Sequence, residues 1–99
     1  MASIVKKKVE RVMTLHPAGK NGVNIEKQKY DWFRAAVISR LQRQELTYTS
    51  LSESIRAELG SGFKGSVGWY VEALKQDLEA RGIIERVAQS RPQRYRLRP

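Results

Sequence analysis

A chain of 99 residues with 40% hydrophobic residues is long enough for one compact domain and too short for two. Its 19 Lys and Arg against 10 Asp and Glu give a formal charge of +9, which should attract polyanions such as nucleic acid or anionic lipid. The absence of cysteine excludes disulfides, thiolate catalysis and the commonest zinc ligand sets.

Residues 1–25 are predicted to form a basic N-terminal arm, followed by a folded domain over residues 26–99. The arm begins with Lys6, Lys7 and Lys8, and no apolar stretch of signal-peptide or membrane-spanning length follows them. We therefore expect a cytoplasmic protein that does not contact a membrane. A proline, two glycines and two asparagines in residues 14–25 disfavour regular structure, while residues 4–13 fit a short helix or a strand equally well.

Three helices are predicted next. Apolar residues at three- and four-residue steps indicate the first, over roughly residues 26–43. Ser50 and Glu53 have capping-box spacing and indicate the start of the second. A glycine-bearing turn separates it from a third helix that runs from Ser66 to about Arg81 and is ended by Gly82. The predicted buried stripes consist of Tyr30, Phe33, Val37 and Leu41, then Leu51, Ile55 and Leu59, then Val67, Val71, Leu74 and Leu78.

The end of the chain is predicted to form a basic β-hairpin. Residues 83–87 and 94–98 have strand character, and the second segment alternates arginine with a large apolar residue. Pro92 belongs in the connecting turn because proline cannot donate to a strand ladder. Residues 86–99 hold five arginines and no acidic residue.

This order of elements indicates a helix-turn-helix with a wing. Residues 74–86 and 95–97 resemble the third helix and wing of bacterial winged-helix transcriptional regulators. Residues 14–25, 65–71 and 90–94 are together similar to a family of small uncharacterised bacterial winged-helix proteins. The resemblance implies an α+β fold that is mainly α, with a three-helix core and a C-terminal wing, and it supplies no activity.

The winged-helix resemblance implies nucleic-acid binding, with DNA as the first expected partner, RNA as an alternative and transcription regulation as the process. The wing should contact phosphates and helix three should enter the major groove. Glu72 and Glu79 lie on the open side of that helix and would oppose phosphate, so base readout has little support. The expected contacts are Lys64, Ser66, Lys75 and Gln76 near helix three, Arg86, Arg91, Arg94, Arg96 and Arg98 in the wing, and Lys6, Lys7 and Lys8 in the arm. The simpler alternative is that the wing arginines only protect a sheet edge from aggregation.

Two tryptophans suggest a different function. The helical wheel turns Trp69 outward beside Ala73, and Trp32 outward from helix one among small residues. Tryptophan among small residues is typical of a protein interface, so the alternative function is a module that forms a homodimer or docks a partner through these residues or the arm. The arm could instead fold back over one or both tryptophans, or a nucleic-acid base could stack on them.

We expect no catalytic activity, no cofactor and no bound metal. The only histidine, His16, lies in the arm, where nothing in the sequence would orient it. Gly19 and Lys20 lack the first glycine, the Ser or Thr and the preceding strand of a phosphate-binding loop.

Overall fold

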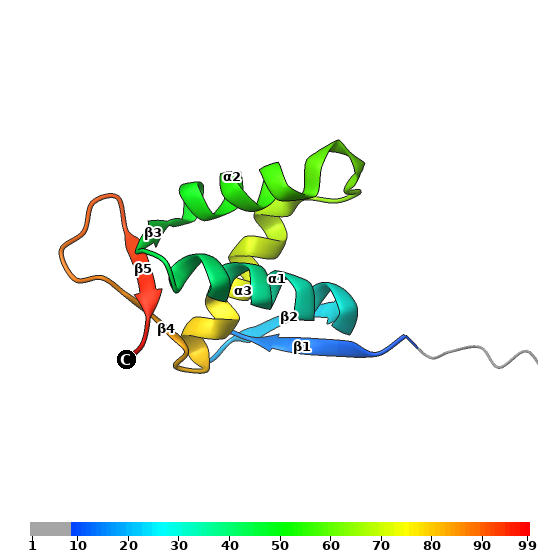
Figure 1. Cartoon of the computed structure of the whole chain (residues 1–99). Coiled ribbons are helices and arrows are strands. Elements are labelled where there is room, and N and C mark those ends of the chain that lie inside the picture. Colours follow the sequence, from blue (N-terminus) through cyan, green and yellow to red (C-terminus); the bar gives the residue numbers. More distant parts are fainter. Residues whose placement is uncertain (1–8) are drawn as a thin grey trace, which may run out of the picture.

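Three helices form the centre of the structure, a computed structural model that describes residues 9–99 (Figure 1). They are α1 (Lys27–Leu41), α2 (Tyr48–Leu59) and α3 (Val67–Ala80). The predicted stripes meet in one core, in which Phe33, Leu51 and Leu74 are fully buried. The bounds of α1 and α3 agree with the prediction to within two residues. Within residues 9–99, no helix combines the length and apolarity needed to cross a membrane.

The start of α2 differs from the prediction. Thr47, not Ser50, is the capping residue, and its side-chain oxygen accepts a hydrogen bond from the Ser50 backbone N–H at 3.1 Å. The helix therefore begins before the predicted capping box, because Thr47 already satisfies one of the free amides of the first turn. At the start of α3, the Ser66 hydroxyl accepts from the Trp69 N–H at 3.1 Å, as the predicted start requires.

A three-stranded antiparallel sheet lies at one end of the helices (Figure 1). Strands β4 (Ile84–Arg86) and β5 (Arg94–Leu97) form the predicted C-terminal hairpin, and the short strand β3 (Leu46–Thr47) pairs with the other edge of β5. Tyr95 is buried while the neighbouring arginines face out, so the predicted alternation is confirmed. Strand β3 was not predicted, because two residues are too short to show a period.

A second hairpin stands where an irregular segment was expected. Strands β1 (Arg11–Leu15) and β2 (Asn21–Glu26) pair antiparallel and lie along α1 and α3 (Figure 1). Ile25 is buried in the core, so the boundary expected between residues 25 and 26 falls inside a strand that belongs to the fold. The prediction of irregular backbone over residues 14–25 is wrong, because only Pro17 and Gly19 lie in the turn, whereas Asn21, Gly22 and Asn24 lie in β2. In the turn, the Gly19 N–H donates to the His16 carbonyl at 3.0 Å with a φ of +76°.

The register of the N-terminal hairpin depends on a close contact between Thr14 and Gly22. The pairing shifts between Met13 and Leu15, and the buried Thr14 hydroxyl accepts a hydrogen bond from the Val23 N–H at 2.8 Å. A Cβ at position 22 would overlap the carbonyl and hydroxyl oxygens of Thr14. Glycine is therefore required here for close approach of the two strands.

Asp77, fully buried on α3, holds the N-terminal hairpin against the helices. Its carboxylate accepts hydrogen bonds from the Leu15 N–H at 2.8 Å and the Tyr30 hydroxyl at 2.6 Å, and forms an ion pair with the Arg81 guanidinium at 2.9 Å. Burial raises the pKa of Tyr30, and the hydrogen bond to Asp77 raises it further. The hydrogen bond to Asp77 also raises the pKa of Arg81. One side chain thus connects β1, α1 and the end of α3, a role that no local sequence pattern indicates.

Candidate functional site

The face of α3 predicted to contact nucleic acid is covered in part. Lys75 is only 7% exposed, so its expected role as an open phosphate contact is wrong. Its ammonium forms an ion pair with Glu72 at 2.6 Å, donates to the Tyr95 hydroxyl at 3.1 Å and lies over the Tyr48 and Tyr95 rings. Burial lowers the pKa of Lys75, but the hydrogen bonds to Glu72 and Tyr95 outweigh it, so the pKa is raised and the lysine stays charged.

Trp69 and Ala73, predicted to share an outward interface, have different environments. Trp69 is 46% exposed, which confirms the phase of the helical wheel. Ala73 is 7% exposed because the N-terminal hairpin lies over it, so its expected exposure is wrong. The sequence could not show this, because the helical wheel does not account for a hairpin that packs from outside.

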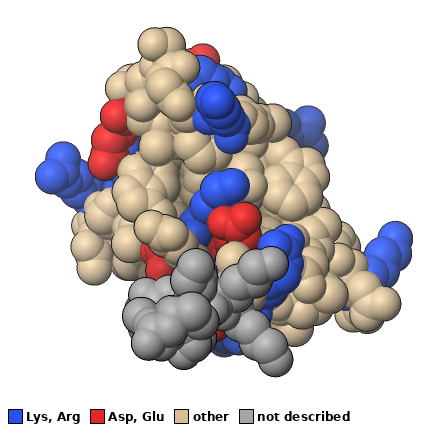
Figure 2. Space-filling model, turned by 90° about the vertical axis from the view of Figure 1, so that its right-hand side faces the viewer, with Lys and Arg blue, Asp and Glu red and all other residues tan. Residues whose placement is uncertain are grey.

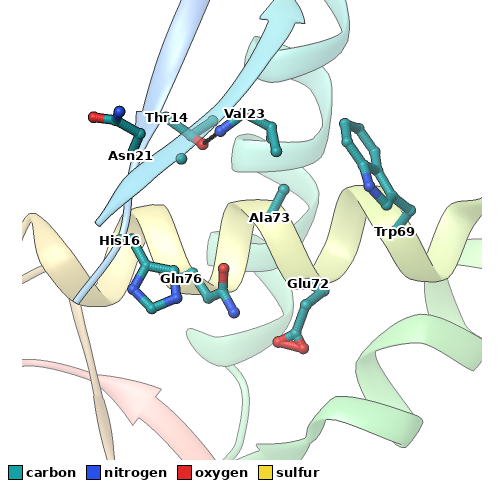
Figure 3. Close-up of a pocket in the computed structure, with 9 residues that line it drawn as sticks. Thr14, His16, Asn21, Val23, Trp69, Glu72, Ala73 and Gln76 are labelled. Carbon is teal, nitrogen blue, oxygen red and sulfur yellow. Dashed lines mark hydrogen bonds between the residues drawn. The ribbon is translucent and has the colours of Figure 1, made fainter. Parts of the chain in front are cut away.

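A hollow of about 240 Å³ remains between the N-terminal hairpin and α3 (Figure 3). Trp69 stands at one side of it, and His16 and Gln76 lie next to each other at the other. The lining combines an apolar floor with several polar groups. It consists of Thr14, His16, Asn21, Gly22, Val23, Trp69, Glu72, Ala73 and Gln76.

The arginines of the C-terminal hairpin point outward, but carboxylates accompany most of them. Glu45 lies 3.4 Å from Arg94, while Glu85 lies 2.7 Å from Arg96. The remaining ion pairs are Arg96 with Glu45 at 3.9 Å, Arg98 with Glu85 at 3.7 Å and Arg86 with Glu79 at 2.8 Å. Arg91 forms no ion pair with another residue of the described chain. Three glutamates against five arginines weaken the positive field that the sequence suggested.

Two of the other predicted nucleic-acid contacts, Lys64 and Ser66, lie just before α3. Lys64 is exposed in the loop before α3, and the Ser66 hydroxyl is used in capping that helix. Lys6, Lys7 and Lys8 lie outside the described residues. On the end of the molecule shown in Figure 2, Lys and Arg appear at separate points on a largely uncharged surface.

Both tryptophans belong to one cluster of aromatic rings. Phe33 and Tyr70 stack with 4.8 Å between their centroids. Trp32 contacts Phe33 edge to face at 5.0 Å, and Trp69 contacts Tyr70 in the same way at 5.0 Å. The two exposed indoles are therefore held by packing against core rings, which fixes their positions before any partner binds.

Trp32 also stands between two hollows of a groove that runs along α1 and α2. The first hollow, of about 310 Å³, lies between Trp32 and Phe63, and the second, of about 240 Å³, lies beside Ala35 and Ser39. A third, of about 230 Å³, shares Ser39 with the second and continues to Arg43. The sequence pattern of α1 indicates Trp32 and its small neighbours, whereas nothing in the sequence indicates the α2 side of the groove, because Leu59 fits the core stripe and Glu58 has no distinguishing pattern.

Groups suited to metal binding are not found in the described part of the chain. Among residues 9–99, no three His, Cys, Asp or Glu side chains lie close enough together to hold a metal ion. The His16 Nδ1 accepts a hydrogen bond from the Ala18 N–H at 3.0 Å, within the turn between β1 and β2.

Comparison with known proteins gives one match. The sequence model of a protein family described as a family of unknown function (DUF6958) matches residues 11–95. No curated protein and no solved structure matches the chain. The matched segment begins with β1, covers the N-terminal hairpin and all of the helices described above, and ends inside β5.

Proposed function

Since the chain belongs to the family of unknown function DUF6958, we propose its function from geometry: it is a protein-interaction module that receives a partner helix in the groove between α1 and α2. The observation that carries this proposal is the position of Trp32. Its indole is 36% exposed, is fixed from behind by Phe33 and is flanked by two hollows. Rigid tryptophans beside pockets are typical anchors of protein interfaces.

The shape of the groove fits a helix better than an extended peptide. The hollows lie near Trp32, Ala36 and Arg40, at four-residue steps along α1, so they repeat about once per helical turn. From Lys29 to Arg40 the groove follows α1 for about 16 Å, at 1.5 Å per residue, which matches a partner helix of about 11 residues. Small side chains at Ala35 and Ser39 would let the partner backbone approach closely.

The charges of the groove favour an acidic partner. In the middle, Arg40 forms an ion pair with Glu58 at 2.6 Å. Toward the ends, Lys29 and Arg43 form no ion pair with another described residue. With Glu26 at the Lys29 end, the groove has three basic side chains against two acidic ones. An amphipathic helix with apolar anchors and acidic flanking residues would complement both features.

Site-specific photocrosslinking tests this proposal. A photoreactive side chain at Ser39 should capture a defined partner in cells of the source organism, whereas the same group at Glu53, exposed on α2 but outside the groove, should not. The purified partner should then bind the wild-type chain and lose at least about tenfold affinity for Trp32→Ala. Identical adducts at both positions, or equal affinity for Trp32→Ala, would contradict the proposal. Capture of a second copy of this chain would instead show that the groove forms a homodimer.

DNA or RNA binding by the C-terminal hairpin, acting as the wing of a winged helix-turn-helix protein, is a second candidate. The sequence of α1, α2, α3 and a basic hairpin supports this arrangement. The side chains of Arg94, Arg96 and Arg98 are 51%, 47% and 61% exposed, and exposed ion pairs are weak enough for phosphate to replace the carboxylate. Because the N-terminal hairpin packs against one side of α3, this candidate relies on phosphate contacts by the wing rather than on insertion of α3 into the major groove.

A further inference from the structure

We propose that the hollow between the N-terminal hairpin and α3 binds a neutral planar heterocycle of about the size of a nucleobase. This site lies apart from the α1–α2 groove and uses Trp69 in place of Trp32. Its residues come from β1, β2, the turn between them and α3, so the site exists only when the hairpin is folded.

The size and walls of the hollow suit a single flat ring system. Its volume of about 240 Å³ is below the usual range for drug-sized ligands. Val23 and Ala73 supply an apolar floor, and the Trp69 indole stands at the side of the opening with about half of its surface exposed (Figure 3). A flat ring that enters between Val23 and Trp69 can contact this indole, and stacking on an aromatic side chain is a common way to hold a base.

Polar groups at the rim supply both donors and acceptors. The side-chain amide of Gln76 offers both, and it makes no hydrogen bond to another described residue. Because the His16 Nδ1 accepts from the Ala18 N–H, the neutral imidazole carries its proton on Nε2 and can donate. Amide side chains pair with the alternating donors and acceptors along a heterocycle edge, as they do with adenine.

The charge of the site selects a neutral ligand. Glu72 is the only carboxylate in the lining, and its charge is matched by the buried ammonium of Lys75 at 2.6 Å. A cationic ring would compete with Lys75 for Glu72, and an anionic ring would meet Glu72 directly. An uncharged ring neither competes with Lys75 nor is repelled by Glu72.

Fluorescence titration of the Trp32→Phe variant tests the proposal, because Trp69 is then the only tryptophan. Adenine and uracil should quench the fluorescence of Trp69 to saturation, and benzylamine and benzoate should bind at least about tenfold more weakly. Tighter binding of a single-stranded oligonucleotide than of the free base would identify nucleic acid as the source of the ring. Tighter binding of the free base or nucleoside would identify a small molecule.

Variants of the same helix separate ligand binding from folding. Ala73→Leu should fill the hollow and abolish quenching, and Gln76→Leu should weaken it with an unchanged circular dichroism spectrum. The matched control is Ala80→Leu, at an exposed position outside the hollow, which should bind normally. No saturable quenching by either base, quenching unchanged by Gln76→Leu, or equal binding of benzylamine would overturn the proposal. None of these outcomes affects the Trp32 groove.

Discussion

The two hairpins of this molecule are attached to the same helices by different means. The C-terminal hairpin is held by a local alternation that buries Tyr95 and by pairing with β3. The N-terminal hairpin buries Ile25 in the core. The position of this hairpin also depends on a hydrogen bond from Leu15 to the carboxylate of Asp77, which is far away in the sequence. A hairpin held by apolar alternation can be recognised from its own sequence, whereas one held by a distant polar anchor cannot. Four changes would break or sharpen this contrast.

The largest effect is expected from Leu74→Ala, which removes support that both hairpins share. Leu74 is fully buried in the core, so the substitution should lower the free energy of unfolding by about 2–5 kcal/mol. Gln76→Ala, at the rim of the hollow, should change it little. Thermal or urea unfolding would measure both, and equal losses would contradict the burial pattern of α3.

Asp77→Asn should separate the two hairpins. The substitution removes the negative charge that interacts with Leu15, Tyr30 and Arg81, and it should lower the free energy of unfolding by about 1.5–3 kcal/mol. We expect the lower end of this range because Arg81 is partly exposed. Hydrogen exchange should quicken at the amides of β1 and β2 before those of β4 and β5. Equal loss of protection in both hairpins would show that Asp77 supports the whole fold.

Tyr30→Phe should change the alkaline stability of the protein. Because the folded pKa of Tyr30 is raised above its ordinary value of 10.0, its contribution is complete below that pH and is lost as the pH rises through the folded pKa. Wild type should therefore lose about 1.4 kcal/mol per pH unit in this window through Tyr30. Urea unfolding across this pH range should show that the difference in free energy of unfolding between wild type and Tyr30→Phe decreases as the pH rises. A constant difference would contradict the raised pKa of Tyr30.

The smallest effect on stability is expected from replacing Arg94, Arg96 and Arg98 together with Gln. Their ion pairs are exposed, so each should contribute no more than about 1 kcal/mol. If the wing binds nucleic acid and each arginine neutralises one phosphate, the log–log salt slope for duplex binding should become shallower by about 2.7. Anisotropy across a salt series on several unrelated duplexes would test this, and no wild-type binding at low salt would remove the second candidate function.

Much of the helical core and the C-terminal hairpin could be predicted, because the stripes of α1, α2 and α3 and the Arg–Tyr–Arg alternation of β5 are local patterns. Trp32 and Trp69 could likewise be placed at the surface. The burial of Lys75 and Ala73 could not be predicted, because it depends on Tyr95 and on a hairpin far away in the chain. Only the α1 side of the groove could be predicted, for the same reason. The small residues of α1 are evident in the sequence, but nothing in the sequence of α2 indicates that this helix lies opposite them.

The contact between Gly22 and Thr14 has a consequence for the evolution of this family. No other residue fits opposite Thr14 while the two strands keep their present register. Related chains that keep this hairpin are therefore expected to keep glycine at this position, however far their charged surfaces diverge. A relative with a larger residue there should also show a changed residue 14 or a different length of turn, so an alignment of diverse members can test the hairpin without any structure.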